Sequence, residues 1–416
     1  MCNETHDDLH SHADRFRSGK RLALVGSTLA MLAFSSCGTL QRSVNHSRSA
    51  SVASLAPPEG VRVGVDNGAD LKRLAGDITA RLASQSGAKH SILALSGGGA
   101  NGAYGAGVMV GWTETGKRPE FDIVTGISTG ALAAPFAFLG SRWDAELQLA
   151  YTDGATRDLL NWLNLSALVS PSLFDSGKLE KLIDRSITPK LLREVAIEHR
   201  NGRRLLVVTT NLDSEAAVIW DMGALAAHGD LSDLMLFRRI LLASASMPGL
   251  FAPVLIARRA PDGYLVDEMH VDGTVSTPFL VVPESLLLWR SPGELPKSSA
   301  IYVLVNGQLA PEYSLTAGDL PSILARSFDS MSKADLRTTL SATAAFAGRN
   351  GMSLQMAEIP VGTHLSSVDL NEASMRALFD LGRSRGAAGT AWASIATAGI
   401  DVLSLPASEP PSLAPK

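Results

Sequence analysis

Cysteine is almost absent from this chain of 416 residues. Its only two cysteines, Cys2 and Cys37, lie before residue 40, so the remainder of the chain carries no thiol. This excludes cysteine-ligated zinc, iron–sulfur clusters, a cysteine nucleophile and an internal disulfide bond from that remainder. Any nucleophile there must use another chemical group, such as a hydroxyl.

A surplus of either charge is missing as well. The chain has 37 Lys and Arg against 41 Asp and Glu, which gives a formal net charge of −4. A surface that binds nucleic acid requires a clear excess of basic residues, so we expect no nucleic-acid partner. Hydrophobic residues make up 45% of the chain and charged residues 19%, which predicts a globular protein with a sizeable core.

The apolar run near the N-terminus is too short to cross a bilayer. Leu22–Phe34 has 13 residues and follows Lys20 and Arg21. A membrane-spanning helix needs about 20 residues, whereas a signal-peptide core has roughly 7–15 apolar residues after a basic start. We therefore expect residues 1–36 to be a signal peptide.

The residues after this run resemble the cleavage box of a bacterial lipoprotein. They are Ser35-Ser36-Cys37-Gly38, preceded by Phe34 where the box usually has an aliphatic residue. The resemblance implies lipidation of Cys37 and a membrane anchor. Gly38 is not the aspartate that favours the inner membrane, so we expect an outer-membrane protein that faces the periplasm. The alternative is an ordinary secretory signal or an uncleaved anchor, in which Cys37 has no role.

Apolar strands and helices alternate through residues 65–400, which we expect to form one domain. Ser-rich residues 37–64 predict a flexible tether, and proline-rich residues 401–416 predict a disordered tail. The expected strands are Ser91–Leu95, Phe121–Thr125, Arg204–Thr209 and Ile301–Val305, and the expected helices include Asp70–Ala83, Ala131–Leu139 and Leu234–Ala243. Strands separated by helices predict an α/β fold, with a mostly parallel central sheet covered on both faces.

A glycine-rich loop follows the first of these strands. Its core is Gly97-Gly98-Gly99-Ala100-Asn101-Gly102. Without Cβ atoms the backbone N–H groups can approach a ligand closely, and at the start of a helix they favour a negative oxygen. The loop is therefore either a pyrophosphate site for a dinucleotide or an oxyanion hole for acyl transfer. A dinucleotide site needs an acidic residue at the end of the second strand, whereas Asp122 lies at the start of that strand.

A serine follows the next expected strand, in Gly126-Ile127-Ser128-Thr129-Gly130. A turn between a strand and a helix is the context in which this pattern presents a nucleophile. Gly126 and Gly130 clear the space on each side of the sharp turn, so that the Ser128 hydroxyl is exposed. Because both motifs follow neighbouring strands, we expect Ser128 to lie beside the glycine loop.

A serine nucleophile needs a base to take its proton. None of the downstream histidines has a motif around it: His199, His228, His270 and His364. Only His364 comes late enough in the sequence for a Ser–His–Asp triad. Asp272 is the better candidate, because the strand-like run Val266–Asp272 ends in Asp272-Gly273 and can bring the carboxylate to the sheet edge. An aspartate is a weak base at its usual pKa, but burial in an apolar cleft raises that pKa.

These motifs occur in the order and context found in patatin-like phospholipases. They are Gly97–Gly102, Gly126–Gly130 and Asp272-Gly273, and the run Ala243–Pro253 is similar to the small-residue, proline-rich segment of that family. The resemblance extends over about residues 91–384. It implies a three-layer α/β/α sandwich and, together with Cys37, a lipoprotein member of the family.

The resemblance also implies a function. Ser128 would be the nucleophile and Asp272 its base in a dyad without histidine, and the backbone around Gly97, Gly98, Gly99 and Gly102 would form the oxyanion hole. The expected activity is that of a serine lipid acyl hydrolase, a phospholipase A or esterase, acting on phospholipid or other acyl esters. Such a dyad needs neither metal nor organic cofactor, so we expect none. The alternative is a non-catalytic, membrane-tethered lipid-binding protein on the same fold.

Two residues depart from the pattern of the family. Asn101 stands where the family commonly has Arg or Lys, which bears on head-group preference but leaves the backbone N–H groups available. Thr274 stands where the family commonly has Gly or Ala. A hydroxyl at this position can narrow the site, or it can hydrogen-bond Asp272 and lower its basicity.

Overall fold

The computed structural model of the chain describes residues 56–84, 89–154, 172, 174–260, 263–283, 299–313, 315–363 and 366–395. The expected signal peptide, Cys37, most of the expected tether and the expected tail lie outside these residues. The predictions made for those segments therefore stay predictions.

One sheet of ten strands runs through the described residues, in the order β1–β5–β4–β3–β2–β8–β9–β10, with β7 joined to β4 and β6 joined to β7. Strands β4, β3, β2, β8 and β9 run parallel, and antiparallel strands flank them on both sides. The strands are β1 Arg62–Gly64, β2 Ser91–Leu95, β3 Ile123–Ile127, β4 Arg204–Asn211, β5 Ala216–Asp221, β6 Val254–Arg259, β7 Leu265–Asp272, β8 Ala300–Leu304, β9 Ser353–Ala357 and β10 Ala393–Ser394. The apolar strands β2, β3 and β4 are buried along their whole length, as in a sheet covered on both faces.

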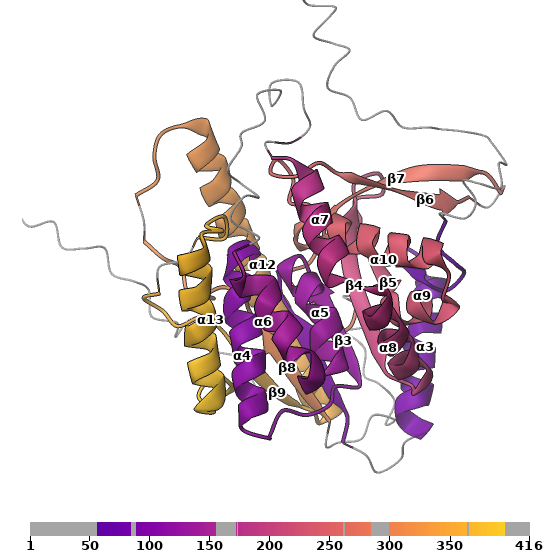
Figure 1. The fold of residues 1–416 in the computed structure, drawn as a ribbon, viewed down its shortest axis with the longest axis horizontal. Coiled ribbons are helices and arrows are strands. Elements are labelled where there is room, and N and C mark those ends of the chain that lie inside the picture. Colours follow the sequence, from indigo (N-terminus) through magenta and orange to yellow (C-terminus); the bar gives the residue numbers. More distant parts are fainter. Residues whose placement is uncertain are drawn as a thin grey trace, which may run out of the picture.

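Helices cover both faces of this sheet. The larger hydrophobic core packs against α4 Gly102–Glu114, α5 Thr129–Leu139, α6 Asp144–Thr152, α7 Ser176–Ser186, α8 Pro189–Arg200, α9 Met222–His228, α10 Leu231–Ser244 and α13 Glu372–Ala387. The second core packs against α3 Gly68–Ser84 and α12 Leu320–Asn350. Figure 1 shows α4, α5 and α6 in front of the sheet. The expected three-layer α/β/α architecture is confirmed.

Helices α4 and α13 approach each other more closely than side chains would permit. A Cβ atom on Gly107 of α4 would lie 2.0 Å from the carbonyl oxygen of Phe379, and one on Gly382 of α13 would lie 2.1 Å from that of Tyr104. These glycines allow backbone-to-backbone packing of the two helices. The packing fixes α13, and with it the segment before α13, beside the glycine loop at the start of α4.

The expected boundary between tether and folded domain was wrong. Residues 62–64, assigned to the tether, form β1 and pair with β5, and both Val61 and Val63 are buried. Alternation of apolar and polar residues over so short a strand is too weak a signal to separate it from a linker. None of the helices in the described ranges has both the length and the apolar character that a bilayer span requires.

Candidate active site

The ends of β3 and β7 meet along one edge of β4. Val208 of β4 pairs with Ile127, the last residue of β3, and the next residue, Thr209, pairs with Asp272, the last residue of β7. Because β3 runs parallel to β4 and β7 runs antiparallel to it, the two strands approach each other end to end. The residue after Ile127 is Ser128, so this register brings the serine motif and the aspartate motif together.

Ser128 has a backbone conformation that residues with side chains rarely adopt. Its φ is 56° and its ψ is −127°, outside the regions that L-residues usually occupy. The strain is held by the surrounding structure, because the Ser128 N–H donates to Ser244 Oγ at 3.1 Å and the Ser244 hydroxyl donates to the Val208 carbonyl at 2.7 Å. Strain of this kind is typical of residues at functional sites.

The two glycines of the serine motif are required by close backbone contacts. A Cβ atom on Gly126 would lie 2.5 Å from the Gly130 carbonyl oxygen, and one on Gly130 would lie 2.5 Å from the Leu95 carbonyl oxygen. The first contact lets α5 turn back sharply after β3, and the second seats α5 against the end of β2. The expected strand–turn–helix arrangement around Ser128 is confirmed.

Ser128 and Asp272 form a direct, buried hydrogen bond. The Ser128 hydroxyl donates to Asp272 Oδ2 at 2.6 Å, and the two residues are only 5% and 1% exposed. Burial raises the pKa of Asp272 from its ordinary 3.8 to about 6, while hydrogen bonds from Ser128 and Thr274 act in the opposite direction. The aspartate is thus ionised at neutral pH and a better proton acceptor than an exposed one.

Several neighbours fix the orientation of Asp272. Oδ1 accepts hydrogen bonds from both the N–H and the hydroxyl of Thr274. The backbone is fixed as well, because the Asp272 N–H donates to the Ser246 carbonyl at 2.9 Å and the Asp272 carbonyl accepts from the Thr210 hydroxyl at 3.0 Å. Gly273 allows this turn to lie against β4, since a Cβ atom there would be 2.5 Å from the Val208 carbonyl oxygen.

The glycine loop lies next to this pair. Gly97 donates its N–H to the Pro278 carbonyl at 3.4 Å, so this N–H is already engaged. Gly98 and Gly99 have φ values of 152° and 56°, which glycine adopts without steric cost. Within the described ranges, their N–H groups donate to no protein acceptor within hydrogen-bond distance. These two groups are therefore the donors that the loop can offer to a ligand.

Residues from the C-terminal part of the chain hold the loop in this shape. The Ala100 N–H donates to the Ser367 carbonyl at 2.9 Å, and the Asn306 side chain donates to the Ser96 carbonyl at 2.9 Å. Gly98 and Gly99 fit closely against these supports, because Cβ atoms on them would each lie 2.1 Å from the carbonyl oxygens of Asn306 and Ser367, respectively.

An apolar pocket opens beside Ser128. Its wall is formed by α5, α6, α7, the segment after α10, and the segment that leads into α13, and Gly99, Ser128 and Asp272 line it as well. The apolar lining side chains are Leu132, Phe136, Ala150, Tyr151, Leu179, Leu182, Ile183, Ile187, Ala245, Met247, Leu250, Phe251, Val368, Leu370 and Met375. Such a lining suits a hydrocarbon chain.

Gly102 and Tyr151 support the start of α5. A Cβ atom on Gly102 would lie 2.1 Å from Thr129 Oγ1, so the glycine makes room for this side chain. The Tyr151 hydroxyl donates to the Thr129 carbonyl at 2.7 Å, and burial raises the pKa of Tyr151 to about 12. Gly102 thus contributes to packing behind the serine, and its N–H donates to the Gly99 and Ala100 carbonyls within the preceding turn.

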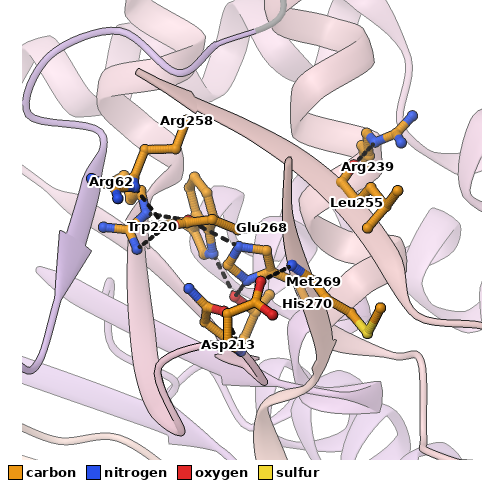
Figure 2. Close-up of polar contacts among 11 residues, drawn as sticks. Arg62, Asp213, Trp220, Arg239, Leu255, Arg258, Glu268, Met269 and His270 are labelled. Carbon is orange, nitrogen blue, oxygen red and sulfur yellow. Dashed lines mark hydrogen bonds and ion pairs between the residues drawn. The ribbon is translucent and has the colours of Figure 1, made fainter. Parts of the chain in front are cut away.

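His270, two residues before Asp272, belongs to a separate buried network (Figure 2). Trp220 Nε1, which can only donate, contacts Thr209 Oγ1 at 2.8 Å, and Thr209 Oγ1 lies 2.9 Å from His270 Nδ1. Glu268 Oε2 lies 3.4 Å from Nε2, and an ionised carboxylate can only accept, so the proton of the neutral ring lies on Nε2 and Nδ1 accepts from the Thr209 hydroxyl. Burial lowers the pKa of His270, so a neutral ring fits this position.

Glu268 links this network to two arginines from other strands. Arg62 of β1 makes two hydrogen bonds to its carboxylate, at 2.9 and 3.0 Å. Arg258 of β6 forms an ion pair with it at 2.6 Å, at an angle outside the hydrogen-bond range. His270 and Glu268 thus connect the hairpin of β6 and β7 to the rest of the sheet.

His199 and His228 pair with acidic residues of β5 and α10, away from the serine motif. His199 is on α8 and lies 3.6 Å from Asp221. His228 Nδ1 lies 2.8 Å from Asp233 Oδ2. The same carboxylate accepts a hydrogen bond from the Asp230 N–H as part of the cap of α10. His364 lies outside the described residues. In the part of the chain that the structure describes, Asp272 is the ionisable group that contacts Ser128.

Sequence analysis did not single out four residues that support the site: Ser244, Ser246, Asn306 and Ser367. Ser244 and Ser246 lie in the run Ala243–Pro253, whose resemblance to a family segment was the only signal for them. Ser367 had no signal, because a backbone carbonyl acting as acceptor leaves no pattern in the sequence. Asn306 acts through its side chain, but its acceptor is the Ser96 carbonyl, which leaves no pattern either.

Comparisons with known proteins find one family model and a similar solved structure. Residues 93–283 match the model of the patatin-like phospholipase family. No curated protein matches the chain. Among solved structures, the chain is similar to VipD from Legionella pneumophila, with 15% sequence identity and a TM-score of 0.34, over 74% of this chain and 68% of that one. The segment that matches the family model contains the glycine loop, Ser128 and Asp272.

Proposed function

We propose that this chain, whose residues 93–283 match the patatin-like phospholipase family, is a serine lipid acyl hydrolase that uses a Ser128–Asp272 dyad. The observation that carries the proposal is the 2.6 Å hydrogen bond from the Ser128 hydroxyl to Asp272 Oδ2, between two residues that line an apolar pocket. A strained nucleophile, a buried base and an acyl-sized apolar surface in one place are the parts that ester hydrolysis needs.

The first half of the reaction forms an acyl-enzyme. Asp272 accepts the Ser128 proton on Oδ2 while Oγ bonds to the ester carbonyl carbon, which gives a tetrahedral oxyanion. The free N–H groups of Gly98 and Gly99 stabilise that oxyanion. The intermediate collapses with loss of the alcohol, which takes the proton back from Asp272.

The second half restores the enzyme. Asp272 deprotonates a water molecule, which attacks the acyl-enzyme carbonyl, and the proton returns to Ser128 as the fatty acid leaves. The same N–H pair serves both oxyanions. Each step uses a proton acceptor with a pKa near 6, which is close enough to neutrality to be ionised and still basic.

The substrate class follows from the pocket beside the dyad. Its walls from α5, α7 and the segment after α10 are almost entirely apolar. The acyl chain of a phospholipid or another lipid ester fits this lining, and the ester carbonyl then lies between Ser128 and the glycine loop. Esters with very short acyl chains fill less of the pocket and lose the corresponding binding energy.

Labelling with an alkyl fluorophosphonate, followed by hydrolysis assays on phospholipid and p-nitrophenyl esters, tests the proposal. The wild-type chain should form a stoichiometric adduct and hydrolyse the esters, and Ser128→Ala should do neither. Ser330→Ala changes an exposed serine on α12 and is the matched control. Absence of an adduct on a folded wild-type chain would instead favour a lipid-binding protein without catalysis.

We also propose that the chain is a lipoprotein anchored through Cys37 in the outer membrane. The support is the signal-like run before Cys37 and the lipoprotein-like residues around it. Expressed in a Gram-negative host, the chain should incorporate labelled fatty acid and fractionate with membranes. Cys37→Ala should abolish the labelling, whereas Cys2→Ala should not. Labelling that persists in Cys37→Ala would refute the assignment.

A further inference from the structure

Thr274 contacts the base from the side opposite the nucleophile. Its N–H donates to Asp272 Oδ1 at 2.9 Å, and its hydroxyl donates to the same oxygen. Oδ2 accepts the Ser128 hydroxyl at 2.6 Å. The two carboxylate oxygens therefore have separate partners: Oδ1 is held by Thr274, and Oδ2 faces the nucleophile.

The glycine loop fits around the Thr274 side chain. A Cβ atom on Gly97 would lie 2.8 Å from Cγ2 and 3.2 Å from Oγ1 of Thr274, and 3.2 Å from Cβ of Ser128. Only glycine leaves room at position 97 for the threonine and the serine together. The packing against Gly97 restricts the rotation of the Thr274 side chain and keeps its hydroxyl on Oδ1.

Among the described residues, the groups that hydrogen-bond Asp272 carry no charge. From β3 and the turn after β7 come the hydroxyls of Ser128 and Thr274, and from β4 and the segment after α10 come the Thr210 hydroxyl and the Ser246 carbonyl. Its own strand contributes the ionisable His270 and Glu268, which bond to each other and to partners away from Asp272. Hydroxyl and N–H donors are therefore what stabilises the ionised carboxylate.

We propose that Thr274 is a positioning residue: by engaging Oδ1 of Asp272, its hydroxyl reserves Oδ2 for the Ser128 proton. The inference rests on the proposed hydrolase function. In the acylation step the O–H bond of Ser128 breaks, its proton goes to Oδ2, and the Oγ electron pair forms the bond to the carbonyl carbon. A carboxylate that lacks one donor on Oδ1 is easier to protonate and is held less firmly.

The pH dependence of kcat/KM tests this role, with p-nitrophenyl butyrate as substrate. Thr274→Val keeps the shape and removes the hydroxyl, so the midpoint of the acid limb should rise by about one pH unit. At optimal pH kcat should fall about tenfold with little change in KM, because ground-state contacts are untouched. Thr274→Ser, which keeps the hydroxyl, should return the midpoint to the wild-type value. An unchanged midpoint in Thr274→Val would overturn the proposal.

Two further variants separate this inference from the proposed function. Thr277→Val removes a nearby hydroxyl that bonds the Phe279 carbonyl and should leave the midpoint unchanged; an equal shift there would refute a specific role for Thr274. Should Thr274→Val fail to fold in a thermal unfolding assay, Thr274→Ala replaces it, and an unshifted midpoint in that variant overturns the inference. Hydrolysis that persists in Ser128→Ala refutes the dyad itself, whereas its loss beside an unshifted Thr274→Val refutes only the role of Thr274.

Discussion

Strand β7 carries two buried carboxylates, Glu268 and Asp272, that lie four residues apart on the same face. Their side chains are in comparable surroundings by burial, since the residues are 6% and 1% exposed. Their partners differ completely. Glu268 contacts both Arg62 and Arg258 (Figure 2), whereas Asp272 contacts neutral hydroxyl and N–H donors.

The two pKa values move in opposite directions for this reason. Burial alone raises both. For Glu268 the hydrogen bond to His270 and the charges of Arg62 and Arg258 outweigh burial, so its pKa is lowered. For Asp272 the donors offset burial only in part, so its pKa is raised to about 6. A partner of opposite charge makes a buried carboxylate a structural ion pair, and its absence makes a buried carboxylate a base.

The largest effect should come from Asp272→Asn. The amide cannot accept the Ser128 proton, so kcat/KM for ester hydrolysis should fall by about 10³-fold or more. Stability to chemical denaturation should be unchanged or higher, because the variant no longer buries a charge without a cationic partner. Steady-state assays and urea unfolding on the same preparation measure both. A variant that keeps a tenth of wild-type activity would remove Asp272 from the chemistry.

Glu268→Gln should lower stability and leave activity nearly unchanged, which is the reverse of the result expected for Asp272→Asn. It leaves Arg62 and Arg258 without a counter-charge, but both retain some contact with water, so we expect a loss of about 2 kcal/mol in the free energy of unfolding. The kcat/KM of the folded fraction should stay within about threefold of wild type, because Glu268 contacts neither Ser128 nor the pocket. A large loss of activity without loss of stability would mean that the two carboxylates are coupled.

The pH dependence of stability should separate the two carboxylates next. The folded chain binds a proton on Asp272 more tightly than the unfolded chain does, because the pKa of Asp272 is about 6 in the folded chain and 3.8 is its ordinary value. The contribution of Asp272 therefore falls as pH rises between these values, by on the order of 3 kcal/mol. The contribution of Glu268 to the free energy of unfolding changes with pH in the opposite direction. Because its pKa is lowered, this contribution is present above the ordinary pKa of 4.5 and is lost as the pH falls.

Urea unfolding from pH 4 to 7 measures these slopes as differences from wild type. Relative to wild type, Asp272→Asn should gain stability as the pH rises through this range. Glu268→Gln should lose most stability at neutral pH, and its free energy of unfolding should approach that of wild type as the pH falls. Parallel curves for wild type and Asp272→Asn would contradict a raised pKa for Asp272.

The fold could be predicted in outline because its central strands have a strong local signal. The strand Ser91–Leu95 was predicted with its observed boundaries, and the parallel sheet between helical layers followed from the alternation of elements. Strands β1, β5, β6, β9 and β10 were not predicted, and the pairings of the short β1 and β10 depend on partners far away in the sequence. The predicted strand at residues 121–125 began two residues early, because Phe121 is buried like a strand residue but the pairing of β3 with β2 starts only at Ile123.

The parts of the candidate site that require particular residue types could be predicted from the sequence. Ser128, Asp272 and the glycine loop were found from motif and context, and the structure brings them together. The register that places the ends of β3 and β7 on one edge of β4 was not predictable, because it depends on pairing between distant strands. Gly97 and Gly102 had been grouped with the oxyanion donors, whereas Gly97 donates to Pro278 and Gly102 makes room for Thr129.

The smallest effect should distinguish the two arginines of Glu268. Arg62 makes two hydrogen bonds from a side chain that is 18% exposed, whereas Arg258 makes a single ion pair from one that is 38% exposed. Water screens the more exposed pair more strongly, so Arg62→Ala should cost about 1 kcal/mol and Arg258→Ala less than about 0.5 kcal/mol.

Arg62 also joins β1 to the hairpin of β6 and β7, so its loss should loosen the N-terminal edge of the sheet. Hydrogen exchange should be faster in β1 of Arg62→Ala and unchanged there in Arg258→Ala, and both variants should keep the wild-type acid limb of kcat/KM. Equal costs for the two arginines would show that the charge near Glu268 matters more than the geometry of its contacts. A shift of the acid limb of kcat/KM in either variant would show that the charges around Glu268 affect the pKa of Asp272. The two carboxylates of β7 would then not be electrostatically independent.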